Sequence, residues 1–329
     1  MAIVVRSPFR VSFLGGGSDI PAFYDEFGDG CVVSSAISKY VYVVGTPRFE
    51  RSGYSLRYSK NEEVDSIDEI QHPIIREVLR EFKVPALELS VVADFPAGTG
   101  LGSSSAFTCA LVSLASHMMG MRLSPPEIAE YACHIEINLL GEPIGKQDQY
   151  ASALGGLNVL KFSNLGVVIE AISLEEYGLE NFERQFRLVH LGLPPRSASE
   201  ILKKQMSPSV SGVESRMAAV KELSILAQRV ALGVLEDPSL VGKAMDEAWQ
   251  LKLKSNPDAV NREIQRVLDL GTALGAKASK VLGAGGSGFA LFWKPEGFTV
   301  DFDLGLAKHD LRALEYKLDL SGTKVLSND

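Results

Sequence analysis

The chain has 329 residues, of which 46% are hydrophobic and 22% are charged, and its formal net charge is −8. This composition is ordinary for a globular enzyme with one large or two smaller domains, and the acidic balance argues against sequence-independent binding of nucleic acid, which requires a basic surface. Residues 1–13 lack the apolar stretch of a signal peptide, and no apolar run approaches the roughly 20 residues that span a bilayer. We therefore expect a cytoplasmic protein without membrane segments, in which Cys31, Cys109 and Cys133 are reduced core residues.

The first half of the chain alternates between β-like and helical patterns. Residues 3–19 open with short strand-like runs that are broken by Pro8 and end at a triple glycine. The Val- and Tyr-rich segment 30–47 predicts two strands or one long bent strand. Further along the chain we expect a helix at 72–82, a strand at 87–94, helices at 104–120 and 124–141 and a strand toward the end of 149–162. In the helix expected at 124–141, Ser124 suits the N-cap and Pro125 the first helical position.

The second half is richer in helical patterns. Segment 181–195 predicts a strand that runs into a proline break, and it is followed by three long helical patterns at 212–236, 238–254 and 257–283, a strand at 288–293 and a closing helix at 303–318. The composition changes near residue 180. We therefore predict two domains, at 1–183 and 184–329.

The first of three glycine-rich loops, "LGGGSD", spans residues 14–19. Its glycines allow a backbone to approach another group closely. Asp19 then projects from a loop that side chains barely crowd, where its carboxylate could accept hydrogen bonds from a polyhydroxylated ligand. An Asx turn or a cap on the following helix is the alternative.

The second loop, "PAGTGLGSSSA", spans residues 96–106 and lies between a predicted strand and a predicted buried helix. This order directs free backbone N–H groups and the positive end of the helix toward one point, so the loop predicts an anion site. No Gly-Lys-Ser/Thr ends it, which excludes a Walker A loop and leaves other groups to balance a phosphate's charge. One of Ser103, Ser104 and Ser105 could serve as the helix N-cap, and the others offer hydroxyls for phosphate or Mg²⁺.

The third loop, "GAGGSG", spans residues 283–288 and matches the pattern GxGxxG. A dinucleotide fingerprint must follow a strand and open a helix, whereas here we expect a helix before the loop and a strand after it. A close approach by another backbone or by a phosphate is the better interpretation.

Two acidic residues, Glu136 and Asp148, lie between the second and third loops. Glu136 falls on the apolar face of a helix, where a carboxylate needs a partner, unless it is an exposed acid at the helix end. Asp148 is either a helix N-cap or a base for a substrate hydroxyl. Two anion-binding loops, a serine cluster and two carboxylates together indicate phosphoryl transfer with Mg²⁺, which depends on positioning and charge neutralisation.

These motifs resemble, in order, the three signature motifs of the GHMP kinases: "PFRVSFLGGGSD", "PAGTGLGSSSA" and "GAGGSGFALF". The resemblance implies an α+β fold of two domains, an N-terminal one like ribosomal protein S5 domain 2 and a ferredoxin-like C-terminal one with extra helices, with ATP and substrate in the cleft between them. It implies ATP phosphate binding by Pro96, Gly98, Gly100, Leu101, Gly102, Ser103, Ser104 and Ser105. It also implies Mg²⁺ ligation by Ser104 and Glu136, and catalysis by Asp148 with Arg10 as the basic residue of the first motif.

Within the family, residues 13–43 are similar to bacterial D-glycero-D-manno-heptose 7-phosphate kinases, and L-fucose kinases are also similar. The resemblance implies phosphorylation of an anomeric hydroxyl, for nucleotide-activated heptose in the first case. Three glycines, Gly15 to Gly17, replace the Gly-Glu-His of galactokinase and mevalonate kinase, which argues against those substrates. The expected substrate-binding residues are Gly16, Gly17, Asp19, Arg196, Gly285 and Gly286.

Arg196 is the candidate for a sugar phosphate because its guanidinium can bind phosphate through two hydrogen bonds. The alternative is an ordinary helix start with a solvated face. Two other functions stay open: a 1-kinase for an unphosphorylated sugar such as fucose or galactose, and a catalytically silent regulator that only binds ATP or sugar.

Overall fold

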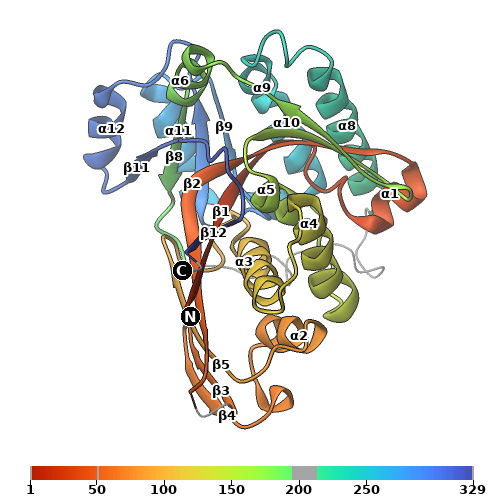
Figure 1. The fold of residues 1–329 in the computed structure, drawn as a ribbon. Coiled ribbons are helices and arrows are strands. Elements are labelled where there is room, and N and C mark those ends of the chain that lie inside the picture. Colours follow the sequence, from red (N-terminus) through yellow and green to blue (C-terminus); the bar gives the residue numbers. More distant parts are fainter. Residues whose placement is uncertain (1, 50–51, 195–212, 328–329) are drawn as a thin grey trace.

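The structure, a computed structural model, describes residues 2–49, 52–194 and 213–327. Its larger sheet contains eight strands, with the order β12-β1-β2-β5-β3-β4 and with β6 and β7 joined to it through β2 (Figure 1). These strands are β1 (Ile3–Leu14), β2 (Gly30–Pro47), β3 (Tyr54–Arg57), β4 (Asn61–Val64), β5 (Leu87–Ala93), β6 (Leu157–Ser163), β7 (Gly166–Ile172) and β12 (Lys324–Ser327).

Strand β2 organises this sheet. It is one continuous strand, which decides between the two alternatives for segment 30–47. It pairs with β1 along most of its length, with β6 through residues 30–35 and with β5 through residues 41–47. The expectation of short broken runs in β1 is wrong, because the strand continues through Pro8. A register shift between Pro8 and Phe9 accommodates the missing N–H donor of the proline.

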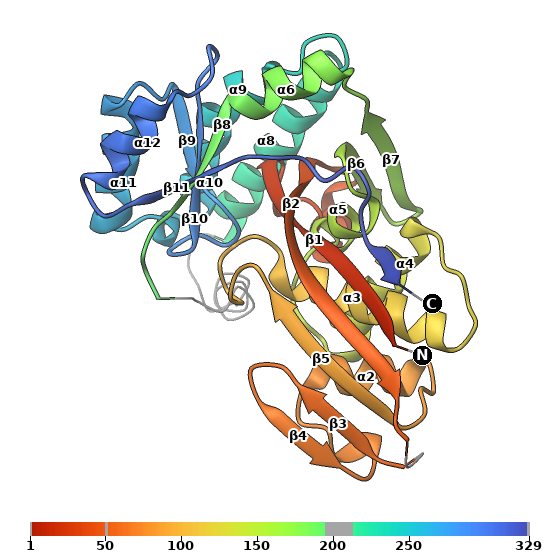
Figure 2. The same cartoon turned by 60° about the vertical axis from the view of Figure 1, so that its left-hand side comes forward.

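The smaller sheet is antiparallel and has the order β11-β8-β10-β9 (Figure 2). Its strands are β8 (Phe186–His190), β9 (Ala278–Val281), β10 (Phe289–Trp293) and β11 (Arg312–Glu315). Numbered along the chain, this order is 4-1-3-2, with helices between the first and second strands and between the third and fourth. That arrangement is ferredoxin-like, with additional helices in the first connection.

Eleven helices, counted within the described ranges, cover the two sheets. They are α1 (Pro21–Phe27), α2 (Pro73–Glu81), α3 (Ser103–Met118), α4 (Pro125–Cys133), α5 (Gln147–Leu154), α6 (Glu176–Arg184), α8 (Val213–Ala231), α9 (Leu240–Lys243), α10 (Met245–Ser255), α11 (Arg262–Ala273) and α12 (Val300–Ala307). Helix α4 continues into a π-helical turn at His134–Leu139, and short 3₁₀ turns occur at Ile67–Glu69 and Pro257–Ala259. Ser124 and Pro125 begin α4 as predicted, and Glu127 accepts a hydrogen bond from the Ser124 backbone at 2.7 Å.

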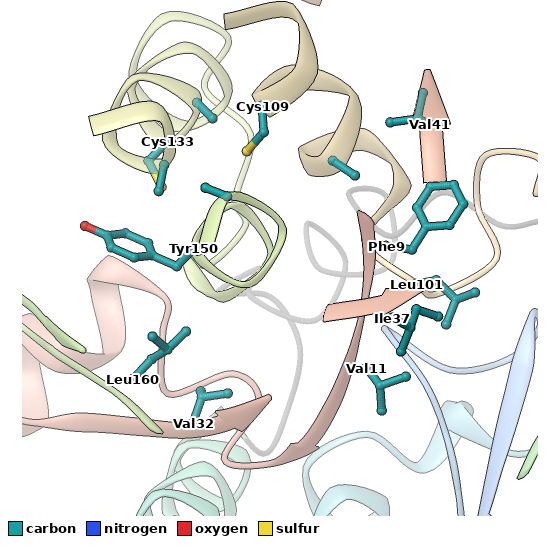
Figure 3. Close-up of a cluster of buried hydrophobic side chains, with 14 of the residues drawn as sticks. Phe9, Val11, Val32, Ile37, Val41, Leu101, Cys109, Cys133, Tyr150 and Leu160 are labelled. Atoms are coloured by element: carbon teal, nitrogen blue, oxygen red, sulfur yellow. The ribbon is translucent and has the colours of Figure 1, made fainter. Parts of the chain in front are cut away.

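The main hydrophobic core lies between the larger sheet and helices α3, α4 and α5 (Figure 3). The apolar run that follows the second glycine loop forms α3, in which residues 108–116 are all buried, so the prediction of a buried helix is confirmed. Phe9 and Val11 reach this core from β1, and Tyr150 reaches it from α5. All three cysteines are buried free thiols, as expected.

Four sequence predictions in the second half need correction. The helical pattern at 257–283 ends at Ala273, and its last part is strand β9. The pattern at 303–318 is helix only to Ala307, and then strand β11. Segment 238–254 forms two helices, α9 and α10, and the start of segment 181–195 is the end of helix α6. Strand pairing outweighs the local helical preference of the Ala- and Lys-rich sequence in β9.

Within the described residues, the structure holds no helix that is both long and apolar enough to cross a membrane. The cytoplasmic location stays a prediction.

Candidate active site

A cavity of about 650 Å³ brings together the three glycine-rich loops and two helices of the second half of the chain. Residues of α8 and α10 contribute to its wall beside residues of β1 and of the N-terminal end of α3. Its volume is within the usual range of small-molecule sites. Each of the loops that the sequence predicted to bind a ligand therefore contributes to one site.

The first loop is folded tightly against β2. Gly15 has a positive φ of +80°, and a Cβ there would lie 1.8 Å from the Cys31 carbonyl oxygen. The hydroxyl of Ser18 donates to the carbonyl oxygens of Gly15 and Cys31 at 2.8 and 3.1 Å. Only glycine fits at position 15, which explains part of the triple-glycine pattern.

Asp19 is 2% exposed and joins this loop to the segment just before Asp148. Its carboxylate accepts hydrogen bonds from the backbone of Gly17 at 2.9 Å and from the backbone and side chain of Gln147, each at 3.1 Å. Burial raises the pKa of Asp19, and these backbone donors oppose that shift. A Cβ on Gly145 would lie 1.8 Å from the carboxylate. Asp19 thus lines the cavity and also holds two loops together.

The second loop leads into α3 through three glycines with positive φ, at positions 98, 100 and 102. Gly102 is the N-cap of the helix and adopts a left-handed conformation, so the expectation that a serine caps this helix is wrong. Ser103, Ser104 and Ser105 form the first turn and line the cavity. The free N–H groups and positive end of a 16-residue helix therefore face the cavity beside three hydroxyl groups.

Arg10 and Asp148 form a bidentate ion pair at this wall. The Arg10 Nε atom lies 2.6 Å from Asp148 Oδ1, and Nη2 lies 2.7 Å from Oδ2. The remaining terminal nitrogen, Nη1, donates to the Gly100 carbonyl oxygen at 2.6 Å. A Cβ on Gly102 would come within 2.9 Å of Arg10 and 3.1 Å of Asp148. The absence of a side chain at Gly102 thus lets the ion pair lie directly against the second loop.

Glu136 lies in the π-helical turn after α4 and is 1% exposed. Its Oε1 accepts a hydrogen bond from the Ser104 hydroxyl at 2.6 Å, and its Oε2 accepts one from the Gln149 side chain at 2.8 Å. Burial raises the pKa of Glu136 to about 7, although both of these donors oppose the shift. The expectation that this carboxylate is buried and partnered is confirmed, and the alternative of an exposed helix-end acid is wrong.

The third loop connects β9 to β10 as a hairpin. A strand therefore precedes it, and the expectation of a preceding helix is wrong; the dinucleotide fingerprint still fails because no helix follows. A Cβ on Gly283 would lie 2.5 Å from the Gly100 Cα atom, and a Cβ on Gly288 would lie 2.1 Å from the Thr99 carbonyl oxygen. The glycines thus permit backbone-to-backbone contact with the second loop, as the interpretation of a close approach predicts.

Most of the residues named from the sequence lie at this cavity. Those that contribute to its wall are Arg10, Gly16, Gly17, Asp19, Gly98, Gly100, Gly102, Ser103, Ser104, Ser105, Glu136, Asp148 and Gly285. Pro96, Leu101 and Gly286 lie outside the wall, with the side chain of Leu101 in the core (Figure 3). Gly286 instead donates its backbone N–H to the Ala259 carbonyl oxygen at 2.9 Å. Arg196 lies outside the described residues.

Sequence reasoning missed two lysines of the cavity wall, Lys252 on α10 and Lys280 on β9. Lys280 donates to the carbonyl oxygens of Ser12 and Phe13 at 3.0 and 2.6 Å, and so joins the smaller sheet to β1 of the larger sheet. Burial lowers the pKa of both lysines, that of Lys252 to about 8. The available signal was the lack of a lysine in the second loop, which implied that cations must come from elsewhere in the chain.

Comparison with known proteins identifies the family. The model of the GHMP kinases N-terminal domain matches residues 70–156, and that of the GHMP kinases C-terminal domain matches residues 226–297. The D-glycero-alpha-D-manno-heptose 7-phosphate kinase of Campylobacter jejuni is 26% identical over 306 residues, which cover 88% of this chain and 89% of that protein. The bifunctional fucokinase/GDP-fucose pyrophosphorylase of Arabidopsis thaliana is 26% identical over 87% of this chain, which spans 29% of that longer protein.

Among solved structures, a D-glycero-D-manno-heptose 1-phosphate kinase from Bacteroides thetaiotaomicron superposes with a TM-score of 0.80 at 20% identity, covering 99% of both chains. This likeness extends over both sheets and confirms the two-domain α+β fold, while the boundary near residue 183 stays a prediction. The chain belongs to the GHMP kinases, ATP-dependent phosphotransferases with an alcohol group as acceptor.

Proposed function

We propose that this kinase phosphorylates the anomeric hydroxyl of a sugar, D-glycero-D-manno-heptose 7-phosphate, for the synthesis of nucleotide-activated heptose. The observation that carries the proposal is the Arg10–Asp148 pair, held at 2.6 and 2.7 Å in the wall of the cavity and directly against the loop that begins α3. A carboxylate that can accept a hydroxyl proton and a helix N-terminus that can bind phosphate thereby face the same space.

ATP would bind with its phosphates at the second loop. The N-terminal end of α3 offers backbone donors and a positive dipole, and Ser103 and Ser105 add hydroxyl donors. The contact of Gly283 with Gly100 places the third loop against the second loop. Because Gly102 of the second loop lies against the Arg10–Asp148 pair, the donor's phosphates would lie beside the carboxylate proposed to accept the hydroxyl proton.

Ser104 and Glu136 fit a Mg²⁺ ion. They supply two oxygen ligands 2.6 Å apart, and the buried carboxylate has no cationic partner among the residues that the structure describes. Within the same residues there is no cluster of three or more His, Cys, Asp or Glu side chains that could hold a metal ion. Mg²⁺ commonly takes one or two protein carboxylates and completes its shell with phosphate oxygens and water. When bound, it would neutralise charge on the phosphates.

Asp148 would orient the acceptor hydroxyl and take its proton as the oxygen attacks phosphorus. Both of its oxygens accept from Arg10, which fixes the plane of the carboxylate. The Asp148 side chain is 23% exposed, so its carboxylate stays accessible from the cavity. The Arg10 side chain is only 6% exposed. Asp19 and Gln147 support this position, because Asp19 accepts from the backbone N–H of the residue just before Asp148.

The choice of a heptose 7-phosphate rests on similarity over nearly the full chain to a protein of that name. The 7-phosphate of this sugar is remote from the reacting hydroxyl and requires a cation. Arg196, which lies outside the described residues, is the candidate that the sequence offers. A fucose-type 1-kinase is the second candidate, because the fucokinase relative matches 87% of this chain.

The test is ADP release with ATP and a panel of D-glycero-D-manno-heptose 7-phosphate, fucose, galactose and mannose, with the phosphorylated position identified by NMR. We expect a preference of orders of magnitude in kcat/KM for the heptose phosphate, because a neutral sugar forgoes several charge-assisted hydrogen bonds. Arg196→Ala should reduce that preference while ATP binding is retained. Rapid turnover of a neutral sugar without turnover of the heptose phosphate would establish the fucose-type alternative.

A further inference from the structure

The second loop carries no lysine, although the phosphates of ATP bring several negative charges to it. The described wall of the cavity contains four Arg or Lys side chains: Arg10, Arg216, Lys252 and Lys280. The charge of Arg10 is bound by Asp148. The ammonium group of Lys280 is directed to two carbonyl oxygens of β1. Lys252 differs from Lys280 in that one of its hydrogen-bond acceptors, Gly283, belongs to the third loop, which packs against the second loop.

Lys252 lies near the C-terminal end of α10, one helical turn before Asn256. Its Nζ atom donates to the Val281 carbonyl oxygen at 3.2 Å and also to that of Gly283. The side chain of Asn256 donates to the Ala284 carbonyl oxygen at 2.8 Å. The last turn of α10 thus supports the start of the third loop through two side chains.

This contact places the ammonium group where the second and third loops meet. Its hydrogen-bond acceptor, Gly283, packs against Gly100, and Gly100 accepts a hydrogen bond from Arg10. The charge of Arg10 is near enough to lower the pKa of Lys252. Lys252 therefore lies beside the anion-binding loop and on the same side of the cavity as the Arg10–Asp148 pair.

The ammonium group lacks a counter-ion. No carboxylate forms an ion pair with Lys252 among the described residues, and two carbonyl oxygens engage two of its three N–H donors. Its other contact is with the Trp249 ring, whose centroid lies 5.9 Å from Nζ, and neither kind of partner carries a negative charge. Burial and the nearby charge of Arg10 lower the pKa of Lys252 to about 8. A bound anion at this point would provide the missing charge.

We propose that Lys252 binds the γ-phosphoryl group of ATP and stabilises its charge during transfer. The proposal rests on the proposed function for the position of ATP at the second loop and of the acceptor at Asp148. The γ-phosphoryl group would lie between those two positions, and Lys252 reaches the second loop through Gly283, which packs against Gly100. In this binding mode the α- and β-phosphates would lie along the loop and the helix N-terminus, farther from Asp148.

The experiment compares the affinity of Lys252→Met and the parent for ADP and for a non-hydrolysable ATP analogue, by calorimetry with Mg²⁺ and without acceptor. The analogue carries the third phosphate and ADP lacks it. We expect Lys252→Met to reduce the affinity for the analogue about 10- to 100-fold, as for loss of one charged hydrogen bond, and the affinity for ADP less than about threefold. Lys252→Arg, which keeps the charge, should recover most of the affinity. Lys254→Met is the matched control, because Lys254 is an exposed lysine on the same helix.

An equal loss of affinity for ADP and the analogue would overturn the proposal, since it would mean that Lys252 only supports the third loop. Unchanged nucleotide affinities with an increased KM for the acceptor would also overturn it, because Lys252 would then serve the acceptor. These nucleotide measurements need no acceptor, so they stand even if the sugar is not the heptose phosphate.

The parent protein provides an independent measurement in case the variants do not fold. Calorimetry at pH 8.5 in two buffers of different ionisation enthalpy reports the protons taken up on binding. If Lys252 meets the third phosphate, the analogue takes up more protons than ADP does, and equal uptake would overturn the proposal. The other charged side chains that line the described wall of this cavity are Arg10, Asp19, Glu26, Glu136, Glu142, Asp148, Arg216 and Lys280.

Discussion

Arg10 and Asp148 lie 138 positions apart in the sequence and share two hydrogen bonds, of 2.6 and 2.7 Å. Arg10 belongs to β1 and Asp148 to the first turn of α5, and both lie against Gly102 of the second loop, at the start of α3. One ion pair therefore fixes β1, α5 and the second loop relative to one another. Catalysis by positioning requires such a fixed relationship.

Replacement of Asp148 by Asn should preserve the shape of the site and remove the charge. We expect kcat to fall by about 100-fold or more, as for loss of a general base, with little change in ATP affinity. Steady-state kinetics with varied ATP and acceptor, together with ATP binding by calorimetry, check this. A variant with near-parental kcat would exclude Asp148 as the base.

Ser104→Ala and Glu136→Gln should each increase the Mg²⁺ concentration that half-maximal activity requires. A hard cation binds oxygen ligands, and each change removes or weakens one of them. Activity should recover in part at high Mg²⁺, which a titration of initial rates measures. Mg²⁺ titrations like that of the parent in both variants would show that these residues are not its ligands.

Gly283→Ala should destabilise the protein through a backbone clash. The new Cβ would lie 2.5 Å from the Gly100 Cα atom, at a residue with a φ of +63°. We expect a loss of about 2–4 kcal/mol in the free energy of unfolding, from strain and overpacking together. Urea unfolding followed by circular dichroism measures this loss.

Gly120→Ala is the matched control for that substitution. Gly120 has a similar positive φ of +74°, but a Cβ there meets nothing within 4 Å. Only the strain of the left-handed conformation applies, so we expect a loss of about 1 kcal/mol. Equal losses for the two variants would show that the contact between the second and third loops contributes no constraint.

Lys252 should contribute an increase in the stability of the ligand-free protein as the pH rises above about 8, whereas the three buried cysteines, whose pKa burial raises, contribute a decrease. The pKa of Lys252 is about 8 in the folded protein and near the ordinary 10.5 when unfolded, so between these values the unfolded chain binds more protons. The unfavourable effect of the charge is complete below pH 8 and disappears toward pH 10.5. The resulting gain is at most about 3 kcal/mol.

Urea unfolding at pH 8, 9 and 10 tests this linkage. Over this range Lys252→Met should lose stability relative to the parent, because the titrating group is gone, whereas the difference between Lys254→Met and the parent should stay constant. Identical slopes for all three proteins would show that Lys252 titrates at an ordinary pKa. The comparison between variants removes the contributions of the other groups that titrate in this range.

The sequence was sufficient to predict the three loops, because glycine and serine clusters act locally on backbone conformation and on hydrogen bonding. It also placed Glu136 correctly, since a carboxylate on an apolar helix face needs a partner. It did not predict β9, where an Ala- and Lys-rich segment is held as a strand by pairing with β10. It also missed Lys252, because a lysine on an amphipathic helix usually lies on the solvated face. Only the contact of α10 with the third loop reveals its position.

Pairing of β12 with β1 constrains the order in which the chain can fold as it leaves the ribosome. Ser7 and Thr323 share a hydrogen bond across 316 positions, and β12 pairs with β1 at Val4, Val5 and Arg6. Until β12 has been synthesised, this edge of β1 presents unpaired backbone groups. All four strands of the smaller sheet are synthesised in that interval. The strand that carries Arg10 therefore gains its second neighbour only after every other element of the site has been translated.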